Sequence, residues 1–195
     1  MPHTRLYLLT PALTDASAFL PRFEAALAAG DVASVLVRLA PGADAKRVVA
    51  PLLEIATGRD VALLIEDDPR LAARLGVDGV HVTSDQVGEA VASFKGQRIV
   101  GAGGIGLRDD AMASGEAGAD YVMFGEGEGA TAAATLERVD WWAPIFQTPC
   151  VAYAASLEDV AALVAAGADF VALGAAVWDA PDPAAAVTAA MKTLS

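Results

Sequence analysis

The sequence predicts a single-domain (β/α)8 TIM barrel of minimal size, and three observations support this fold class. Apolar strand-like runs alternate with segments of helical period from one end of the chain to the other. A Gly-x-Asp-x-Val junction occurs at 76–80, 118–122 and 167–171, each time after a helical segment and before an apolar run. The strands lack polar alternation, which is typical of a parallel sheet buried on both faces. Eight such units favour a closed barrel over the alternative, a doubly wound open sheet.

The expected elements cover the whole of one domain, residues 1–195. Strands are expected at 5–9, 33–38, 61–65, 79–82, 98–101, 120–124, 149–153 and 169–173. Helices are expected at 15–28, 43–57, 69–75, 84–95, 107–117, 129–146, 156–166 and 182–194, several of them introduced by Asp, Ser or Pro. The pair Trp141-Trp142 is expected to cover the barrel wall or to pack at a subunit contact.

Composition narrows the class of protein. A hydrophobic content of 55% and a mean hydropathy of +0.45 exclude a disordered chain. The net charge of −12 disfavours nucleic acid as a partner, because such binding depends on Lys and Arg at phosphates. Neither a membrane span nor a secretory leader is recognisable, so a cytoplasmic protein is expected. Cys150, the single cysteine, is expected to be a small buried hydrophobic residue.

Candidate site residues follow the strands, because the active site of a barrel is built from loops at the carboxyl ends of its strands. The segments at the carboxyl ends of the expected strands are, in order, Arg38, the acidic run 66–68, His81 with 82–85, the glycine-rich run 101–104, the run 125–129, Tyr153 and 174–176. We expect these segments to meet at one rim.

The acidic run Glu66-Asp67-Asp68 has two interpretations. Its carboxylates emerge together after an apolar strand, where hard oxygen ligands suit Mg²⁺. Alternatively, Asp68 before Pro69 caps the next helix, whose dipole favours nearby acids. Capping explains one acid well but not three, so both interpretations stay open.

His81 ends a strand, and it too has two interpretations. Its side chain faces the barrel mouth as a proton carrier or ligand-binding group, or it is a structural histidine whose hydrogen bonds are satisfied. Asp85, four residues later, is expected in the first turn of a helix capped by Thr83 or Ser84.

The run 101–106 matches the spacing G-x-G-x-x-G between a strand and a helix. Taken literally, this is a dinucleotide fingerprint and would indicate an oxidoreductase. It occurs in the fifth unit rather than the first, however, so we favour a loop whose backbone amides line the barrel mouth.

Taken together, these pieces resemble the thiamine-phosphate synthase/TenI family of small (β/α)8 proteins over nearly the whole chain. The matching segments are 6–10, 36–38, 64–67, 71–82, 99–101, 118–125 and 166–169. The resemblance implies a reaction of thiamine biosynthesis. Synthases of the family join an aminopyrimidine diphosphate to a thiazole phosphate, with Mg²⁺ helping pyrophosphate to leave and a pyrimidine carbocation to form. TenI relatives instead aromatise the thiazole phosphate.

The resemblance also implies site residues and partners. It places Arg38 at the diphosphate and Asp67 at the metal, with Glu66 beside it and Asp85 as a further ligand if its loop shifts by one residue. The other substrate-binding positions that it implies are His81, Gly101, Gly103, Gly104 and Gly125. A phosphorylated thiazole or pyrimidine is the expected ligand, Mg²⁺ the expected cofactor and a homodimer an expected assembly, with neither nucleic acid nor membrane as a partner.

Several positions depart from the family pattern. The polar neighbours of Arg38 fall on Leu36 and Ala40, and Gln86 stands at the position of the second metal-binding aspartate. The Thr-Thr-Lys loop after the sixth strand is replaced by 126–128, which carries two glutamates and no lysine. These changes predict a degraded diphosphate site. The alternative function is therefore a non-catalytic small-ligand-binding or interaction protein that retained the fold.

Overall fold

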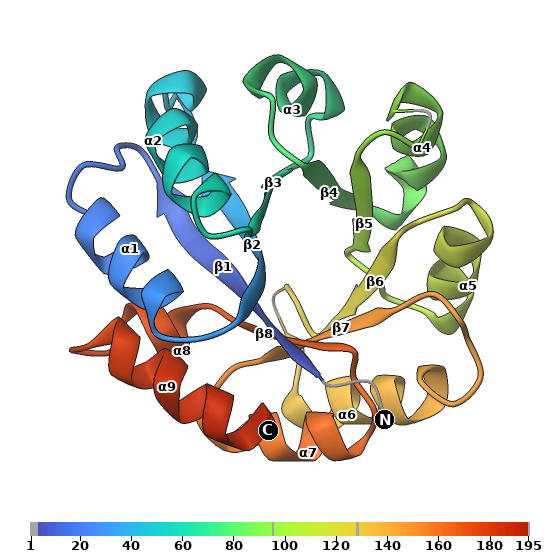
Figure 1. Ribbon diagram of the computed structural model, residues 1–195. Helices are drawn as coiled ribbons and strands as arrows, with labels where there is room; N and C mark the ends of the chain where they lie inside the picture. Colours follow the sequence, from blue (N-terminus) through green and yellow to red (C-terminus); the bar gives the residue numbers. More distant parts are fainter. Residues whose placement is uncertain (1–3, 95, 128, 195) are drawn as a thin grey trace.

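The protein is a closed barrel of eight parallel strands. The computed structural model describes residues 4–94, 96–127 and 129–194. Each strand pairs with its neighbours in chain order, and β8 closes the barrel by pairing with β1. Helices surround the strands on the outside, as the view along the barrel shows (Figure 1). The closed strand order confirms the barrel and excludes the open-sheet alternative.

The strands agree with the sequence prediction to within a few residues, and the helices agree in order. The strands are β1 (Arg5–Leu13), β2 (Val32–Leu39), β3 (Ala62–Glu66), β4 (Gly79–Thr83), β5 (Ile99–Gly103), β6 (Tyr121–Phe124), β7 (Cys150–Ala154) and β8 (Phe170–Leu173). The helices are α1 (Leu20–Ala28), α2 (Ala45–Thr57), α3 (Pro69–Leu75), α4 (Val87–Phe94), α5 (Arg108–Glu116), α6 (Ala132–Trp142), α7 (Val160–Ala165), α8 (Ala175–Trp178) and α9 (Pro183–Leu194), with 3-10 turns at Ser84–Gln86 and Leu157–Asp159.

Three helices differ most from the expectation. Helix α1 begins at Leu20 rather than at residue 15. Helix α6 is shorter than 129–146, because Gly127 and Gly129 have positive φ and Thr131 begins the helix by accepting a hydrogen bond from the Ala134 amide. Helix α8 was not expected, because its four residues are too short for a periodic pattern.

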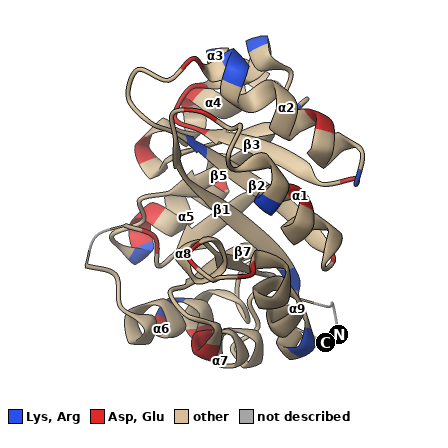
Figure 2. Ribbon diagram, turned by 90° about the vertical axis from the view of Figure 1, so that its left-hand side faces the viewer, with Lys and Arg blue, Asp and Glu red and all other residues tan. Residues whose placement is uncertain are grey.

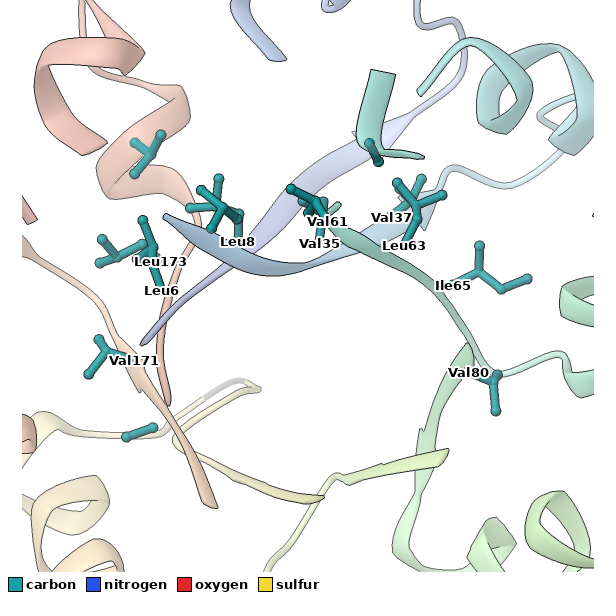
Figure 3. Close-up of a cluster of buried hydrophobic side chains, with 14 of the residues drawn as sticks. Leu6, Leu8, Val35, Val37, Val61, Leu63, Ile65, Val80, Val171 and Leu173 are labelled. Atoms are coloured by element: carbon teal, nitrogen blue, oxygen red, sulfur yellow. The ribbon is translucent and has the colours of Figure 1, made fainter. Parts of the chain in front are cut away.

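Side chains alternate along each strand between the barrel interior and the layer under the helices. Inward-facing residues form one cluster inside the barrel, which includes Tyr7, Leu36, Leu64, Tyr121 and Met123. The residues between them face outward and pack against the helices, among them those labelled in Figure 3: Leu6, Leu8, Val35, Val37, Val61, Leu63, Ile65, Val80, Val171 and Leu173. This alternation sends the inward residues nearest each carboxyl end to the barrel mouth.

The repeated aspartates have a shared structural role at the opposite end of the barrel. Asp78, Asp120 and Asp169 each accept a hydrogen bond from a backbone amide at the start of the preceding strand, at 2.7–2.8 Å. The amides are those of Leu63, Val100 and Cys150, in β3, β5 and β7. Each Gly-x-Asp-x-Val junction therefore ties the beginning of one strand to its neighbour.

The tryptophan pair covers the barrel wall, one of its two expected positions. Trp142 is buried, stacks on Phe146 with ring centroids 3.9 Å apart, and donates its indole N–H to the Thr148 carbonyl. Trp141 is half-buried and lies against the Arg108 guanidinium. Cys150 is buried as expected, and burial raises the pKa of its thiol to about 12.

Acidic residues outnumber basic ones, 25 to 13, and the side view shows them on several helices and loops (Figure 2). Basic residues on this side lie in small separate segments. No helix within the described ranges is long and apolar enough to cross a membrane.

Candidate active site

Two adjacent cavities open at the carboxyl ends of the strands. The first, of about 310 Å³, lies over β2 to β6 and is lined by Arg38, Asp67, His81 and others. The second, of about 380 Å³, lies between the β5–α5 loop and the start of α6. Gly104 and Glu126 line both cavities, so they lie at the boundary between them.

Arg38 and two carboxylates form one side of the first cavity. Arg38 Nε donates to Glu66 Oε1 at 2.9 Å, as expected for inward-facing residues on the adjacent strands β2 and β3. The terminal nitrogens of Arg38 make no hydrogen bond within the described part of the chain, so they remain available to a ligand. The Asp67 carboxylate likewise has no hydrogen bond or ion pair there. Asp67 has φ +58, a conformation that Asp tolerates better than most residues.

His81 and Glu126 line the cavity next to these carboxylates, since His81 pairs in register with Glu66 across β3 and β4. Both oxygens of Glu126 lie 3.1 Å from His81 Nε2, and Glu126 Oε1 also accepts the Gly104 amide at 2.7 Å. Burial by itself raises the pKa of Glu126. The hydrogen bonds from His81 and Gly104 and the charge of Arg38 lower this pKa by more than burial raises it, so the net pKa lies below its ordinary value. The carboxylate is therefore ionised at neutral pH although its side chain is only 17% exposed.

The pair continues into the barrel as a hydrogen-bonded chain. His81 Nδ1 lies 2.9 Å from the Tyr121 hydroxyl, which lies 2.8 Å from the Tyr7 hydroxyl. Burial raises the pKa of both phenols, so they are neutral. Tyr7 has no other hydrogen-bond partner among the described residues, so its O–H is best used as a donor to Tyr121. Tyr121 then donates to Nδ1, and His81 carries its proton on Nε2, toward Glu126.

The glycines of β5 leave the space that these side chains occupy. A Cβ on Gly103 would overlap Glu126 Oε1 and His81 Nε2, and a Cβ on Gly101 would overlap the Tyr121 ring. Both glycines are therefore required by close packing.

The first cavity brings together most of the predicted site residues, but not all. Arg38, Glu66, Asp67, His81, Gly103 and Gly104 line it. Gly101 instead lies deeper, against the Tyr121 ring, and Gly125 lines the second cavity. Glu128, part of the departing loop, lies outside the described residues.

The expected metal ligands do not form a three-ligand site. In the described ranges, no three His, Cys, Asp or Glu side chains are grouped so that they could hold a metal ion. Glu66 is paired with Arg38, and Asp85 lies in a 3-10 turn where it accepts the Thr83 hydroxyl at 2.6 Å. Asp68 is the helix cap, because it accepts the Leu71 amide and precedes Pro69 at the start of α3.

Sequence reasoning did not select Tyr7 or Tyr121 as parts of the site, and it gave Glu126 no specific role there. The tyrosines are ordinary strand residues in the sequence, and only the barrel register brings them beneath His81. Glu126 was included in the run 125–129 at the end of the sixth expected strand and was noted as a departure from a lysine-bearing loop. The sequence nevertheless contained a signal for Glu126. A carboxylate at the end of a buried strand needs a hydrogen-bond partner, and His81 lies two strands away.

Comparison with known proteins supports the family expected from the sequence. The family model described as thiamine monophosphate synthase matches residues 6–177. The chain is 43% identical over 202 residues to the thiamine-phosphate synthase of Rhodospirillum centenum, with 96% of each chain covered. It is 42% identical over 206 residues to that of Hyphomonas neptunium, with 96% of this chain and 92% of the relative covered.

Solved structures show the same barrel. A thiamine phosphate pyrophosphorylase from Pyrococcus furiosus matches with a TM-score of 0.83 and 21% identity, covering 97% of this chain and 95% of that one. A 3-hexulose-6-phosphate synthase from Salmonella typhimurium matches with a TM-score of 0.77 and 17% identity, covering 97% and 98%. Likeness at these identities shows the fold alone. The family model and the full-length relatives establish that the chain belongs to the thiamine-phosphate synthase family.

Proposed function

We propose that the protein is a thiamine-phosphate synthase that joins an aminopyrimidine diphosphate to a thiazole phosphate. The observation that carries this proposal is the first cavity, where the free guanidinium edge of Arg38 lies with the free Asp67 carboxylate and the Gly103-Gly104 backbone. A guanidinium edge suits phosphate oxygens, because it offers parallel N–H donors. In the reaction, the bond between the pyrimidine methylene and the diphosphate breaks, and the thiazole nitrogen forms the new C–N bond.

We propose Mg²⁺ as the cofactor, held by Asp67 together with the phosphate oxygens of the substrate. The donor set fits this arrangement, because Mg²⁺ keeps several waters and is commonly bound through one or two carboxylates plus substrate phosphates. A closed protein site of three carboxylates is not needed. When bound, Mg²⁺ would offset the negative charge of the leaving pyrophosphate.

The test is formation of thiamine phosphate from the two purified precursors and Mg²⁺, followed by chromatography of the product. Arg38→Gln should lower the rate by at least about tenfold, since a charge-assisted contact to phosphate is lost. Arg5→Gln is the matched control, because Arg5 is also a strand arginine paired with a carboxylate but lies at the opposite end of the barrel. Absence of product, together with absence of thiazole phosphate binding, would refute the proposal.

A second candidate is a non-catalytic protein that binds a small ligand in the same cavity. It is favoured by the carboxylates of Glu66 and Glu126, which line the same cavity as Arg38 and repel a diphosphate. A thermal-shift experiment separates the two candidates, because a bound ligand raises the unfolding temperature. Stabilisation by uncharged or cationic metabolites but not by the phosphorylated precursors would favour the second candidate.

The assembly and location are also proposals. The exposed apolar side chains of Leu107 and Ile145 are compatible with a homodimer contact, which light scattering of the purified chain would test. Phosphorylated substrates do not cross membranes unaided, and this is compatible with a cytoplasmic location.

A further inference from the structure

The charged side chains that line the first cavity in the described part of the chain are the guanidinium of Arg38 and the carboxylates of Glu66, Asp67 and Glu126. Arg38 and Glu126 both line it, and the Arg38 charge is felt at Glu126, whose carboxylate it helps to keep ionised. Arg38 offers free terminal N–H donors, whereas Glu126 offers acceptors. A ligand that spans the cavity would meet a donor surface at one end and an acceptor surface at the other.

Glu126 retains acceptor capacity toward the cavity. Its Oε1 accepts from Gly104 and His81, whereas Oε2 accepts from His81 alone within the described part of the chain. A carboxylate has about four lone-pair positions, so Oε2 can accept a further hydrogen bond. The chain through His81 and Tyr121 fixes the carboxylate in place before a ligand arrives.

Gly103 and Gly104 line the cavity beside Glu126. Both contribute only backbone there, and the Gly104 amide is already used by Glu126. Arg38 is the only lysine or arginine of the described residues that lines the first cavity, so a phosphate placed at the Glu126 end would face that carboxylate. An uncharged planar ring with an N–H donor would not be repelled by this carboxylate and could donate a hydrogen bond to it.

We propose that Glu126 is a specificity-determining residue that accepts a hydrogen bond from the exocyclic amino group of the aminopyrimidine ring, while Arg38 binds the diphosphate at the other end of the cavity. This inference rests on the proposed synthase function, whose substrate it orients. The replacement of the lysine-bearing loop after β6 thus supplies a contact to the ring in place of a contact to phosphate.

The experiment compares two ligands, the aminopyrimidine diphosphate and an analogue with hydrogen in place of the amino group. Binding of each is measured by calorimetry with Mg²⁺ and without thiazole phosphate, so that no product forms. The wild-type protein should prefer the amino ligand by about tenfold to hundredfold, the usual range for a hydrogen bond to a charged group.

Variants then show whether Glu126 is the source of this preference. Glu126→Ala should bring the ratio of the two affinities close to one, and Glu126→Gln should give an intermediate ratio because its amide oxygen still accepts. If Glu126→Ala only disturbed the structure of the cavity, it would weaken the binding of both ligands by the same factor and leave the ratio of the two affinities unchanged. Glu137→Gln is the matched control, since this exposed glutamate on α6 pairs with Arg108 outside the cavity and should leave the ratio at the wild-type value.

The outcomes separate this inference from the function on which it rests. Equal binding of the two ligands by the wild-type protein, binding of neither, or a preference that persists in Glu126→Ala would overturn the inference. If thiamine phosphate forms but the ratio does not depend on Glu126, only the inference fails. If the ratio depends on Glu126 but no thiamine phosphate forms, the synthase proposal fails and recognition of the amino group stands.

Discussion

Replacing Gly103 by alanine tests the packing on which the His81–Glu126 pair depends. Gly103 does not have positive φ, so alanine can adopt its backbone conformation without strain. The added methyl group would overlap Glu126 Oε1 and His81 Nε2 and would lie 2.8 Å from Glu126 Cδ, whereas ordinary contacts begin near 3.4 Å. The substitution therefore acts first on these two side chains.

The expected cost is about 2–4 kcal/mol in the free energy of unfolding. Inserting a methyl group into a packed site costs about 1–3 kcal/mol. Displacing Glu126 also breaks its hydrogen bonds to His81 and Gly104, and a lost bond to a charged group costs about 1.5–3 kcal/mol. The sum is discounted because Glu126 is partly exposed and can move toward water. For a chain of this length the melting temperature should fall by roughly 4–16 °C.

Urea unfolding followed by circular dichroism measures this cost, with Gly88→Ala as the control. Gly88 lies within helix α4, and a Cβ there would have no atom within 4 Å, so alanine should stabilise the protein by about 0.5–1 kcal/mol. Combining Gly103→Ala with Glu126→Ala should cost less than the sum of the single changes by about 0.5 kcal/mol or more, because the first clash is removed. Strict additivity, or a Gly103→Ala protein as stable as wild type, would refute the packing argument.

Three further predictions follow from the barrel and its buried groups. Asp120→Ala should lower the free energy of unfolding by about 0.5–1.5 kcal/mol, because the Val100 amide loses its acceptor, whereas Asp120→Asn should retain most of it; urea midpoints of the two variants would be compared. Because the pKa of Glu126 is lowered in the folded state, its contribution to stability should be present above the ordinary value of 4.5 and lost as the pH falls through the lower folded pKa; Glu126→Gln should remove this part of the acid dependence of the urea midpoint. The Cys150 thiol, with its pKa raised to about 12 and its side chain buried, should resist a thiol reagent at mildly alkaline pH in the native protein and react fully in guanidinium chloride; rapid reaction of the folded protein would contradict the burial.

The fold was predictable because each unit repeats the same local signals. Apolar runs, helix caps and the three Gly-x-Asp-x-Val junctions all indicate the same alternation, and the structure confirms eight strands in chain order. The role of the three junction aspartates was harder to predict from the sequence. Their position before a strand is visible in the sequence, but the amide that each one accepts belongs to the preceding strand, about 15–20 residues earlier.

The site was predictable only where it depends on strand ends. Arg38, Glu66 and His81 face inward at those ends, so the alternation of a strand is enough to place them at the mouth. Glu126 lies in a loop two residues beyond β6, and no periodicity says whether such a residue points outward or folds back over the barrel. Asp85, which the family resemblance offered as a further metal ligand, does not line the cavity with Asp67, because it lies in a 3-10 turn and accepts the Thr83 hydroxyl.

The glycine run after residue 100 gives the most instructive contrast between pattern and structure. Its G-x-G spacing resembles a dinucleotide fingerprint, yet Gly101 and Gly103 are successive inward positions of one strand. Gly101 pairs in register with Tyr121 and leaves room for its ring, and Gly103 leaves room for Glu126 just beyond the same neighbouring strand. Alternate glycines on a barrel strand can therefore indicate that large side chains from the next strand occupy the space beside them. They need not indicate a phosphate-binding loop. Here those side chains are the two that hold His81, so the spacing that first indicated a nucleotide instead marks the hydrogen-bonded chain beneath the cavity.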